Sequence, residues 1–402
     1  MEPHVAKRIH TASHLPRAPR LLRVKIGLAI LGLTIVTALV FVTANMTPTP
    51  TASSPMSGAT STSSQPNPQH VFVINLENTD YARAWGPASK APYLSKTLRA
   101  DGLLLDNYYA IYHSSLPNYI GQLSGQGPNT NTINDCAVYH SFVSTGVTDY
   151  GQQAGKGCLY PASVQTVAGQ LTANGLSWKA YMEDMSTPCR HPVLDTADQT
   201  KKARVGDQYT TRHNPFMYFA SITGSTDCAS NVVDLSELTN ALKSTVTTAN
   251  LSYITPNLCH DGHDNPCVDG TPGGLPASDA WLREWVPKIT NSPAFKQDGM
   301  LVITFDEGDE EGAAGSLASS EAAAKETDQG PGAPLKEIFG PGGGRVGALI
   351  LSPFIKPGST SETVYNHYSL LGSIENIFSL PYLGYAGVPN LNKFGVDVYN
   401  AK

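Results

Sequence analysis

Short, largely apolar runs, most of them with β-branched residues, recur along the chain, and each run ends in polar residues or proline. Apolar runs of this length are typical of strands that are buried on both faces of a parallel sheet. The five runs are His70–Leu76, Leu176–Met182, Asn250–Thr255, Met300–Phe305 and Val346–Ser352.

The segments between these runs favour helices. Ser163 is a good helix cap, and Asn174-Gly175 is a good stop signal. The predicted helices are Ala91–Ala100, Leu116–Leu123, Ser163–Ala173, Leu235–Thr247, Ala277–Thr290 and Tyr368–Phe378. Strands that alternate with helices predict an α/β fold with a doubly wound, mostly parallel central sheet and helices on both faces. Such sheets bind ligands at the carboxyl ends of their strands.

The N-terminal part of the chain has a different pattern. Residues 1–25 are basic, and residues 26–44 contain 17 consecutive uncharged, mostly apolar residues. This is the pattern of a signal peptide or signal anchor, although the apolar stretch is at the short limit for crossing a bilayer. We therefore expect a protein that is secreted or anchored on the extracytoplasmic face of the membrane, with membrane contact through this segment if it is not cleaved.

Two further segments favour irregular structure. Residues 45–69 are rich in Thr, Ser and Pro, which predicts a disordered linker before a folded domain at residues 70–402. Residues 308–344 are rich in Gly, Ala, Ser and Glu, and predict a flexible loop with a short helix near Ser320–Glu326.

Charge and cysteine content narrow the class of protein. The net charge is −6, and residues 1–44 contribute +5, which leaves −11 for the rest of the chain. An acidic body argues against nucleic-acid binding, which requires a basic face. The six cysteines all lie in the body, and in an oxidising compartment they predict three disulfides. Pairing between sequence neighbours is our expectation, with Cys259–Cys267 as the first choice.

Acidic and amide side chains follow two of the predicted strands. Glu77 and Asn78 come directly after the first run, and Asp306 and Glu307 follow the run that ends at Phe305. Oxygen ligands of this kind suit a hard divalent cation, and two adjacent carboxylates repel each other unless a cation lies between them. An ordinary turn, a helix cap or an acidic loop is the alternative at each place.

The run His113–Tyr119 places a serine before a predicted helix. Pro117 suits the first turn of that helix, so Ser115 is expected at the N-terminus, where backbone N–H groups and the helix dipole favour an anion. Such groups stabilise a serine alkoxide and phosphoryl oxygens. A plain N-cap serine is the alternative.

Histidines supply the remaining candidates. His260, Asp261, His263 and Asp264 fall within five residues after a predicted strand, and both residue types bind divalent metals. A solvated polar turn is the alternative there. His367 precedes the last predicted helix, where it is either a ligand or a capping or packing residue.

Taken together, these motifs resemble the phosphoesterase family of bacterial secreted acid phosphatases and phospholipases C, within the alkaline-phosphatase-like superfamily. The resemblance spans about residues 70–390 and is closest to the acid phosphatase branch that acts on phosphoinositides. Its most specific segments are VFVINLEN at 71–78, SLPNY at 115–119, TFDEG at 304–308 and LSPFIKPG at 351–358.

The resemblance implies a role for each candidate residue. It implies Ser115 as the nucleophile, with His113, His260 and His263 as catalytic residues and Asn118 as a ligand of the phosphoryl group. The implied ligands of one or two divalent metal ions are Glu77, Asn78, Asp261, Asp306, Glu307 and His367. Because related two-zinc enzymes often have Asp-His where this chain has Asp306-Glu307, the identity and number of the metals stay open.

The expected function is that of an exported, metal-dependent phosphatase that hydrolyses phosphate monoesters, including phosphoinositides, through a phosphoserine. The expected substrate is thus a phosphorylated small molecule or lipid. A phospholipase C-type phosphodiesterase is the first alternative, because the same phosphoryl chemistry serves both. A non-catalytic surface binding domain is the second.

Overall fold

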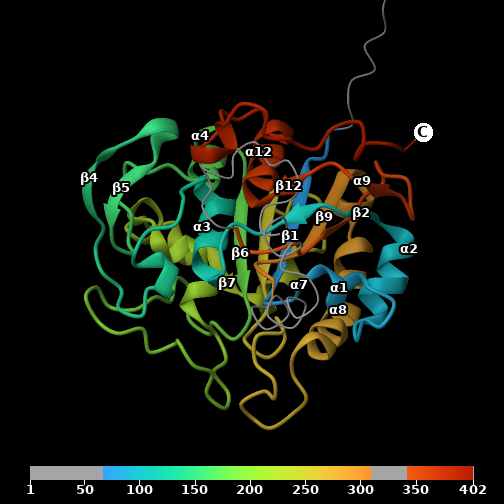
Figure 1. Ribbon diagram of the computed structural model, residues 1–402, viewed down its shortest axis with the longest axis horizontal. Helices are drawn as coiled ribbons and strands as arrows, with labels where there is room; N and C mark the ends of the chain where they lie inside the picture. Colours follow the sequence, from blue (N-terminus) through green and yellow to red (C-terminus); the bar gives the residue numbers. More distant parts are fainter. Residues whose placement is uncertain (1–66, 309–341, 402) are drawn as a thin grey trace, which may run out of the picture. The chain divides into compact units, whose positions relative to one another are not determined.

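The computed structural model describes residues 67–308 and 342–401. Its centre is an eight-stranded sheet with the order β11-β2-β10-β9-β1-β8-β6-β7. Figure 1 shows the sheet nearly face on, from β6 at the left to β2 at the right. The strands are β1 (His70–Leu76), β2 (Leu103–Leu105), β6 (Trp178–Met182), β7 (Val232–Asp234), β8 (Leu251–Thr255), β9 (Gly299–Phe305), β10 (Ala348–Leu351) and β11 (Thr360–Ser361).

The central strands are parallel and fully buried. β1 pairs in parallel with β8 and β9, and every residue of these three strands is buried, which requires cover on both faces. β10 is the exception in direction, because it is antiparallel to both β9 and β2. The prediction of a mostly parallel α/β sheet is therefore confirmed, and all five predicted strands exist.

The helices are shorter and less regular than the sequence suggested. Ala91–Ala100 begins as a π-helical segment rather than an α-helix, Thr166 caps α4 in place of Ser163, and Leu235–Thr247 forms only two short turns. The α-helices are α1 (Tyr81–Trp85), α2 (Arg99–Asp101), α3 (Ser115–Ser124), α4 (Val167–Ala173), α5 (Ala220–Thr223), α6 (Cys228–Asn231), α7 (Leu238–Ala241), α8 (Leu275–Thr290), α9 (Pro293–Asp298) and α12 (His367–Ile377).

The remaining short elements lie in the connections. The π-helical segment is η1 (Tyr93–Leu98), and the 3-10 turns are η2 (Thr132–Asn134), η3 (Asp149–Gly151), η4 (Thr211–His213), η5 (Pro215–Tyr218), η6 (Leu235–Glu237) and η8 (Gly384–Gly387). Two small sheets pair β3 (Tyr108–Tyr109) with β12 (Tyr365–Asn366) and β4 (Val143–Val147) with β5 (Gln153–Lys156).

Three disulfides join sequence neighbours, as predicted. They are Cys136–Cys158, Cys189–Cys228 and Cys259–Cys267. The predictions for residues 1–66 and 309–341, which include the N-terminal signal, most of the linker and most of the loop, lie outside the described residues. Within the described ranges, no helix has the length and apolar character needed to cross a membrane.

Candidate active site

Glu77 is the first residue after β1, and its carboxylate lies at the centre of the site. The side chain is fully buried. The Ser115 hydroxyl donates to Oε2 over 2.9 Å, and the Tyr119 hydroxyl donates to Oε1. The imidazole Nε2 of His213 lies 3.4 Å from the same Oε1. Segments far apart in the sequence therefore meet at the carboxyl end of β1.

Ser115 begins α3, as the sequence predicted. Pro117 occupies the first turn, and Gly125 ends the helix in the left-handed conformation with φ 67°. The N-terminus is not fully free, because the carboxylate of Asp135 accepts the backbone N–H of Leu116 and the hydroxyl of Ser114. Ser115 itself is buried and oriented by Glu77.

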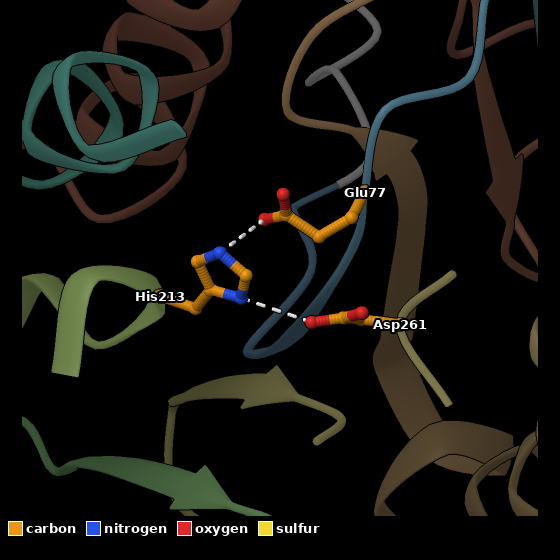
Figure 2. Close-up of side chains that lie close together, drawn as sticks. All are labelled: Glu77, His213 and Asp261. Carbon is orange, nitrogen blue, oxygen red and sulfur yellow. Dashed lines mark hydrogen bonds and ion pairs between the residues drawn. The ribbon is translucent and has the colours of Figure 1, made fainter. Parts of the chain in front are cut away.

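His213 lies between two carboxylates in Figure 2. Its Nδ1 is 2.9 Å from Asp261 Oδ2, and its Nε2 faces Glu77. The ring stacks on Tyr119 with centroids 5.4 Å apart. Burial, followed by the positive charge of Arg212, lowers the pKa of His213 well below its usual value, so the ring is neutral. A neutral ring that donates through Nδ1 presents the lone pair of Nε2 towards Glu77.

Asp261 enters the site from the loop after β8, which the Cys259–Cys267 disulfide closes. Its backbone carbonyl accepts the N–H of Glu77, and its Oδ1 accepts the N–H of His263. Gly262 makes this tight turn possible with φ 103°, and a Cβ there would lie 2.8 Å from the Ser278 hydroxyl.

Asp306 and Asn78 complete the oxygen-rich side of the site. The N–H of Asn78 donates to Asp306 Oδ1 over 3.1 Å. Asp306 directly follows β9, and its own N–H donates to the carbonyl of Leu76 at the end of β1. Burial raises the pKa of Asp306 to about 6, although side-chain contacts with Glu77 and Ser115 oppose the shift. These contacts place Asp306 beside the serine.

Negative charge is concentrated in this interior. Burial, then the charges of Asp306 and Asp261, raises the pKa of Glu77 well above its usual value. Burial has the same effect on the pKa of Asp261. Arg212, which is itself buried, opposes both shifts. Three carboxyl groups buried this closely can share the interior only as neutral acids or around further positive charge.

The residues present fit a divalent cation. Glu77, His213 and Asp261 offer ligand atoms that lie within 4.8 Å of one another. The buried atoms that have no hydrogen-bond partner among the described residues include three of metal-ligand type around Glu77: Asn78 Oδ1, His213 Nε2 and Asp306 Oδ2. Ligand atoms about 2.0–2.2 Å from a tetrahedral ion lie roughly 3.3–3.6 Å apart, and Glu77 and His213 are separated by 3.4 Å.

Two other predicted residues lie beside this group. Glu307 is largely buried and lies 3.5 Å from Nδ1 of His113. Asn118 is buried below Ser115, where its amide accepts the N–H groups of Ile111 and Tyr112 and donates to two backbone carbonyls. These contacts brace the loop that precedes the serine, and a role for Asn118 in phosphate binding stays a prediction.

The two histidines of the loop after β8 point to different partners. Nδ1 of His260 donates to Glu183, at the end of β6, and this hydrogen bond raises the pKa of His260. Arg212 donates to Nε2 of His263, which fixes the proton of that ring on Nδ1, where it faces Asp264. Among the described residues, Nε2 of His260 forms no hydrogen bond, whereas Nε2 of His263 accepts one from Arg212.

His367 hydrogen-bonds the backbone of Asp306 and does not lie among the side chains that surround Ser115. Its Nε2 donates to the backbone carbonyl of Asp306 over 2.6 Å, and its Nδ1 accepts from Gln122. Burial lowers the pKa of His367 to about 4. Both ring nitrogens are thus engaged with protein groups, and a role as a metal ligand stays a prediction.

Sequence reasoning missed His213, Tyr119 and Arg212. His213 and Arg212 come from the long connection between β6 and β7, and neither directly follows a strand. The search for polar residues at strand ends could therefore not find them. Tyr119 was detectable, because it lies four residues after Ser115 on a predicted helix and so on the same face.

Comparisons with known proteins identify relatives of this chain. The chain is 28% identical over 312 residues to a phosphate-repressible acid phosphatase of Penicillium chrysogenum, covering 77% of this chain and 59% of that protein. It is 22% identical to a phosphatidylinositol-3-phosphatase of Mycobacterium tuberculosis, covering 81% of each. The first three curated relatives extend well beyond the match, which spans 55–59% of their length.

A solved structure of an alkaline phosphatase superfamily protein from Vibrio parahaemolyticus is 12% identical, with 79% of this chain and 68% of that chain covered. Its TM-score of 0.45 is too low to establish a shared fold. The profile of the Phosphoesterase family matches residues 87–381, which is most of the chain. The chain therefore belongs to the Phosphoesterase family.

Proposed function

We propose that this protein is an exported, metal-dependent phosphatase that hydrolyses phosphate monoesters through a phosphoserine at Ser115. The observation that carries the proposal is the 2.9 Å hydrogen bond from Ser115 to Glu77 within a cluster of buried carboxylates. A serine that only caps a helix does not need a buried acid as its partner. The acid phosphatase and phosphatidylinositol-3-phosphatase names of the relatives support a phosphomonoester substrate.

Glu77, Asn78 and Asp306 would hold a cation next to Ser115, with His213 and Asp261 on the other side of Glu77. Such a cation lowers the pKa of a bound hydroxyl and neutralises charge on the phosphoryl oxygens. The role of Glu307 as a further ligand belongs to the same proposal, whereas His367 would ligate the cation only after giving up its hydrogen bond to Asp306 or to Gln122.

In the reaction that we propose, Glu77 accepts the proton of Ser115, whose oxygen attacks phosphorus in line. The new bond from the serine oxygen to phosphorus forms as the bond to the alcohol breaks. The departing alcohol takes a proton from a histidine at the rim, His113 or His260. Water then attacks phosphorus and gives a proton to that histidine, while the bond between the serine oxygen and phosphorus breaks. Glu77 returns its proton to the serine oxygen as phosphate leaves. The raised pKa of His260 keeps that ring protonated in mildly acidic solution.

Export is supported by the three disulfides, since such bonds persist in oxidising compartments. The basic and apolar pattern of residues 1–44 supports the same location. Whether the protein is released or stays anchored depends on cleavage near Ala44.

The test is phosphate release by the purified chain from an aryl phosphate monoester, with and without a chelator. We expect Ser115→Ala to lose at least about 1,000-fold in kcat/KM, because no nucleophile remains. Ser124→Ala, at the other end of the same buried helix, is the matched control and should keep its activity. Activity of Ser115→Ala at the level of the control would refute the proposal. Faster turnover of a bis-aryl phosphate would favour a phosphodiesterase, and absence of both metal and turnover in the wild type would favour a binding domain.

A further inference from the structure

The connection between β6 and β7 contains a loop that projects from the edge of the sheet. Arg190 and Asp207 close it at the base with two hydrogen bonds of 2.8 and 2.7 Å, and the Tyr209 hydroxyl donates to the carbonyl of Arg190. We call residues 190–207 the basic loop. In Figure 1 it lies among the lime-green segments at the lower left, at the edge where β1 and β8 end.

The basic loop combines exposed cations with exposed apolar side chains. Lys201, Lys202 and Arg204 are exposed and form no ion pair within residues 67–308 and 342–401. Val205 is 77% exposed at the tight turn formed by Arg204 and Asp207. Val193 is 73% exposed and Leu194 41% exposed on the other arm of the loop.

Within the described residues the carboxylates of the loop form no ion pair with these cations, although Arg204, after Arg190, lowers the pKa of Asp207. Asp207 is paired with Arg190, and Asp195 lies 3.0 Å from His140. Asp198 is largely buried and accepts hydrogen bonds from Thr200. Residues 190–207 hold four basic and three acidic side chains, a net charge of +1, on a chain whose net charge is −6. This local reversal of charge indicates an anionic partner.

The basic loop is attached directly to the candidate active site. Arg212 donates to the carbonyl of Lys201 over 2.8 Å, and the N–H of Thr211 donates to the Thr200 hydroxyl over 2.8 Å. His213 is the next residue of the same 3-10 turn and faces Glu77. A surface that binds the loop would thus be held close to the serine.

We propose that the basic loop docks the enzyme on anionic phospholipid membranes, so that phosphomonoester headgroups are presented to Ser115. Exposed valine and leucine beside lysine and arginine suit the boundary between headgroups and acyl chains. The neighbouring loop after β8 carries the exposed carboxylate of Asp269, which an anionic membrane repels. The attraction to the membrane is therefore confined to the basic loop. The substrate in this inference rests on the proposed function, whereas the binding of the basic loop to the membrane does not.

The experiment compares full-length proteins by sedimentation with vesicles of phosphatidylcholine alone and with added phosphatidylserine. The readout is the partition coefficient with phosphatidylserine divided by the partition coefficient with phosphatidylcholine alone. Any contribution to binding that does not depend on lipid charge cancels in this ratio. Lys201→Glu/Lys202→Glu/Arg204→Glu should lower this ratio by about a hundredfold, since each basic side chain near such a surface contributes about fivefold.

The matched control is Lys96→Glu/Lys243→Glu/Lys296→Glu, with the same change in net charge. These three lysines are exposed. Lys243 and Lys296 precede the amino ends of β8 and β9. Lys96 is in η1, which packs against α8. Equal ratios for the two triple variants would overturn the proposal. A wild type whose binding does not rise when phosphatidylserine is added would overturn it as well.

Activity separates the two proposals. The basic-loop variant should keep wild-type turnover of a soluble aryl phosphate and lose at least about tenfold on a phosphoinositide in vesicles. If the wild type binds anionic vesicles but hydrolyses neither substrate, the docking surface stands and the proposed function fails.

Discussion

Tyr119 and Ser115 lie one turn apart on α3, and their hydroxyls donate to the two oxygens of a single carboxylate, that of Glu77. The two donors hold the carboxylate in one orientation. The tyrosine satisfies the oxygen that also faces His213, so the serine is left as the exchangeable partner.

Replacing Tyr119 by Phe should destabilise the protein mainly when no metal is bound. The variant removes one donor from a buried acid, which costs about 1–3 kcal/mol of unfolding free energy. A cation beside Glu77 would compensate for much of this loss. We therefore expect the loss of Tm to be larger in a chelator than with saturating divalent metal, measured by calorimetry.

Tyr160→Phe is the matched control, because that phenol is also buried and hydrogen-bonded, to Asn129. Its loss of Tm should be the same with and without metal. An equal loss for Tyr119→Phe in both conditions would contradict a cation at Glu77.

His213→Gln should weaken metal binding by at least about 100-fold, since changes just outside the ligand shell already cost 10–100-fold. The measurements are isothermal titration with Zn²⁺, Mn²⁺ and Mg²⁺ and metal analysis of the purified protein. His191→Gln is the control, because that ring is exposed and, among the described residues, hydrogen-bonds the carbonyl of its neighbour Pro192. An unchanged affinity in His213→Gln would limit His213 to hydrogen bonding between Glu77 and Asp261.

Glu375 should make stability depend on pH far from the active site. This carboxyl on α12 is buried, one oxygen accepts the N–H of Leu383, and the other lacks a hydrogen-bond partner among the described residues. Burial raises its pKa from 4.5 to about 9. The folded state thus binds a proton that the unfolded state releases, so this contribution to stability is complete below about pH 4.5 and is lost as pH rises towards 9.

Glu375→Gln should therefore flatten the fall of the unfolding free energy between about pH 4.5 and 9, by up to about 1.4 kcal/mol per pH unit. Urea denaturation at a series of pH values measures this slope. Glu362→Gln, at an exposed position, should leave it unchanged. A slope that is the same in both variants would show that Glu375 is ionised in the folded protein at neutral pH.

Removing disulfides should separate global stability from the integrity of the site. In the chain-entropy treatment, a loop of 39 residues contributes about 4 kcal/mol and one of 8 residues about 2.5 kcal/mol. Cys189→Ser/Cys228→Ser should thus lower Tm more than Cys259→Ser/Cys267→Ser. Metal affinity should follow the opposite order, because Asp261 lies two residues from Cys259. The same order for Tm and metal affinity would contradict this assignment.

The sheet and one half of the site follow from local sequence patterns. Runs in which apolar residues predominate favour a strand that is buried on both faces, which is why His70–Leu76 is predicted with its bounds. Glu77, Asn78, Asp306 and Glu307 follow such runs directly, and the carboxyl ends of neighbouring parallel strands must meet. Ser115 joins them because a helix start was recognisable from Pro117.

The other half depends on tertiary contacts that local patterns do not encode. His213 meets Asp261 across 48 residues of sequence, from a connection without periodic structure. His260 and His263 illustrate the same limit, because adjacent positions in one polar run receive different partners, Glu183 and Arg212. Helix propensity also predicted an α-helix at Ala91–Ala100, where the structure has a π-helical segment that packs against α8.

The antiparallel pairing of β10 with β9 has a consequence for the path of the chain between these two strands. A parallel neighbour would oblige the chain to travel back along the whole sheet, which takes a dozen or more residues. Here the chain leaves β9 and enters β10 at the same edge, the one that carries Asp306. The two described ends of this connection meet there, because the N–H of Gly308 donates to the carbonyl of Gly343, so the chain returns to the sheet beside Asp306 without crossing the core.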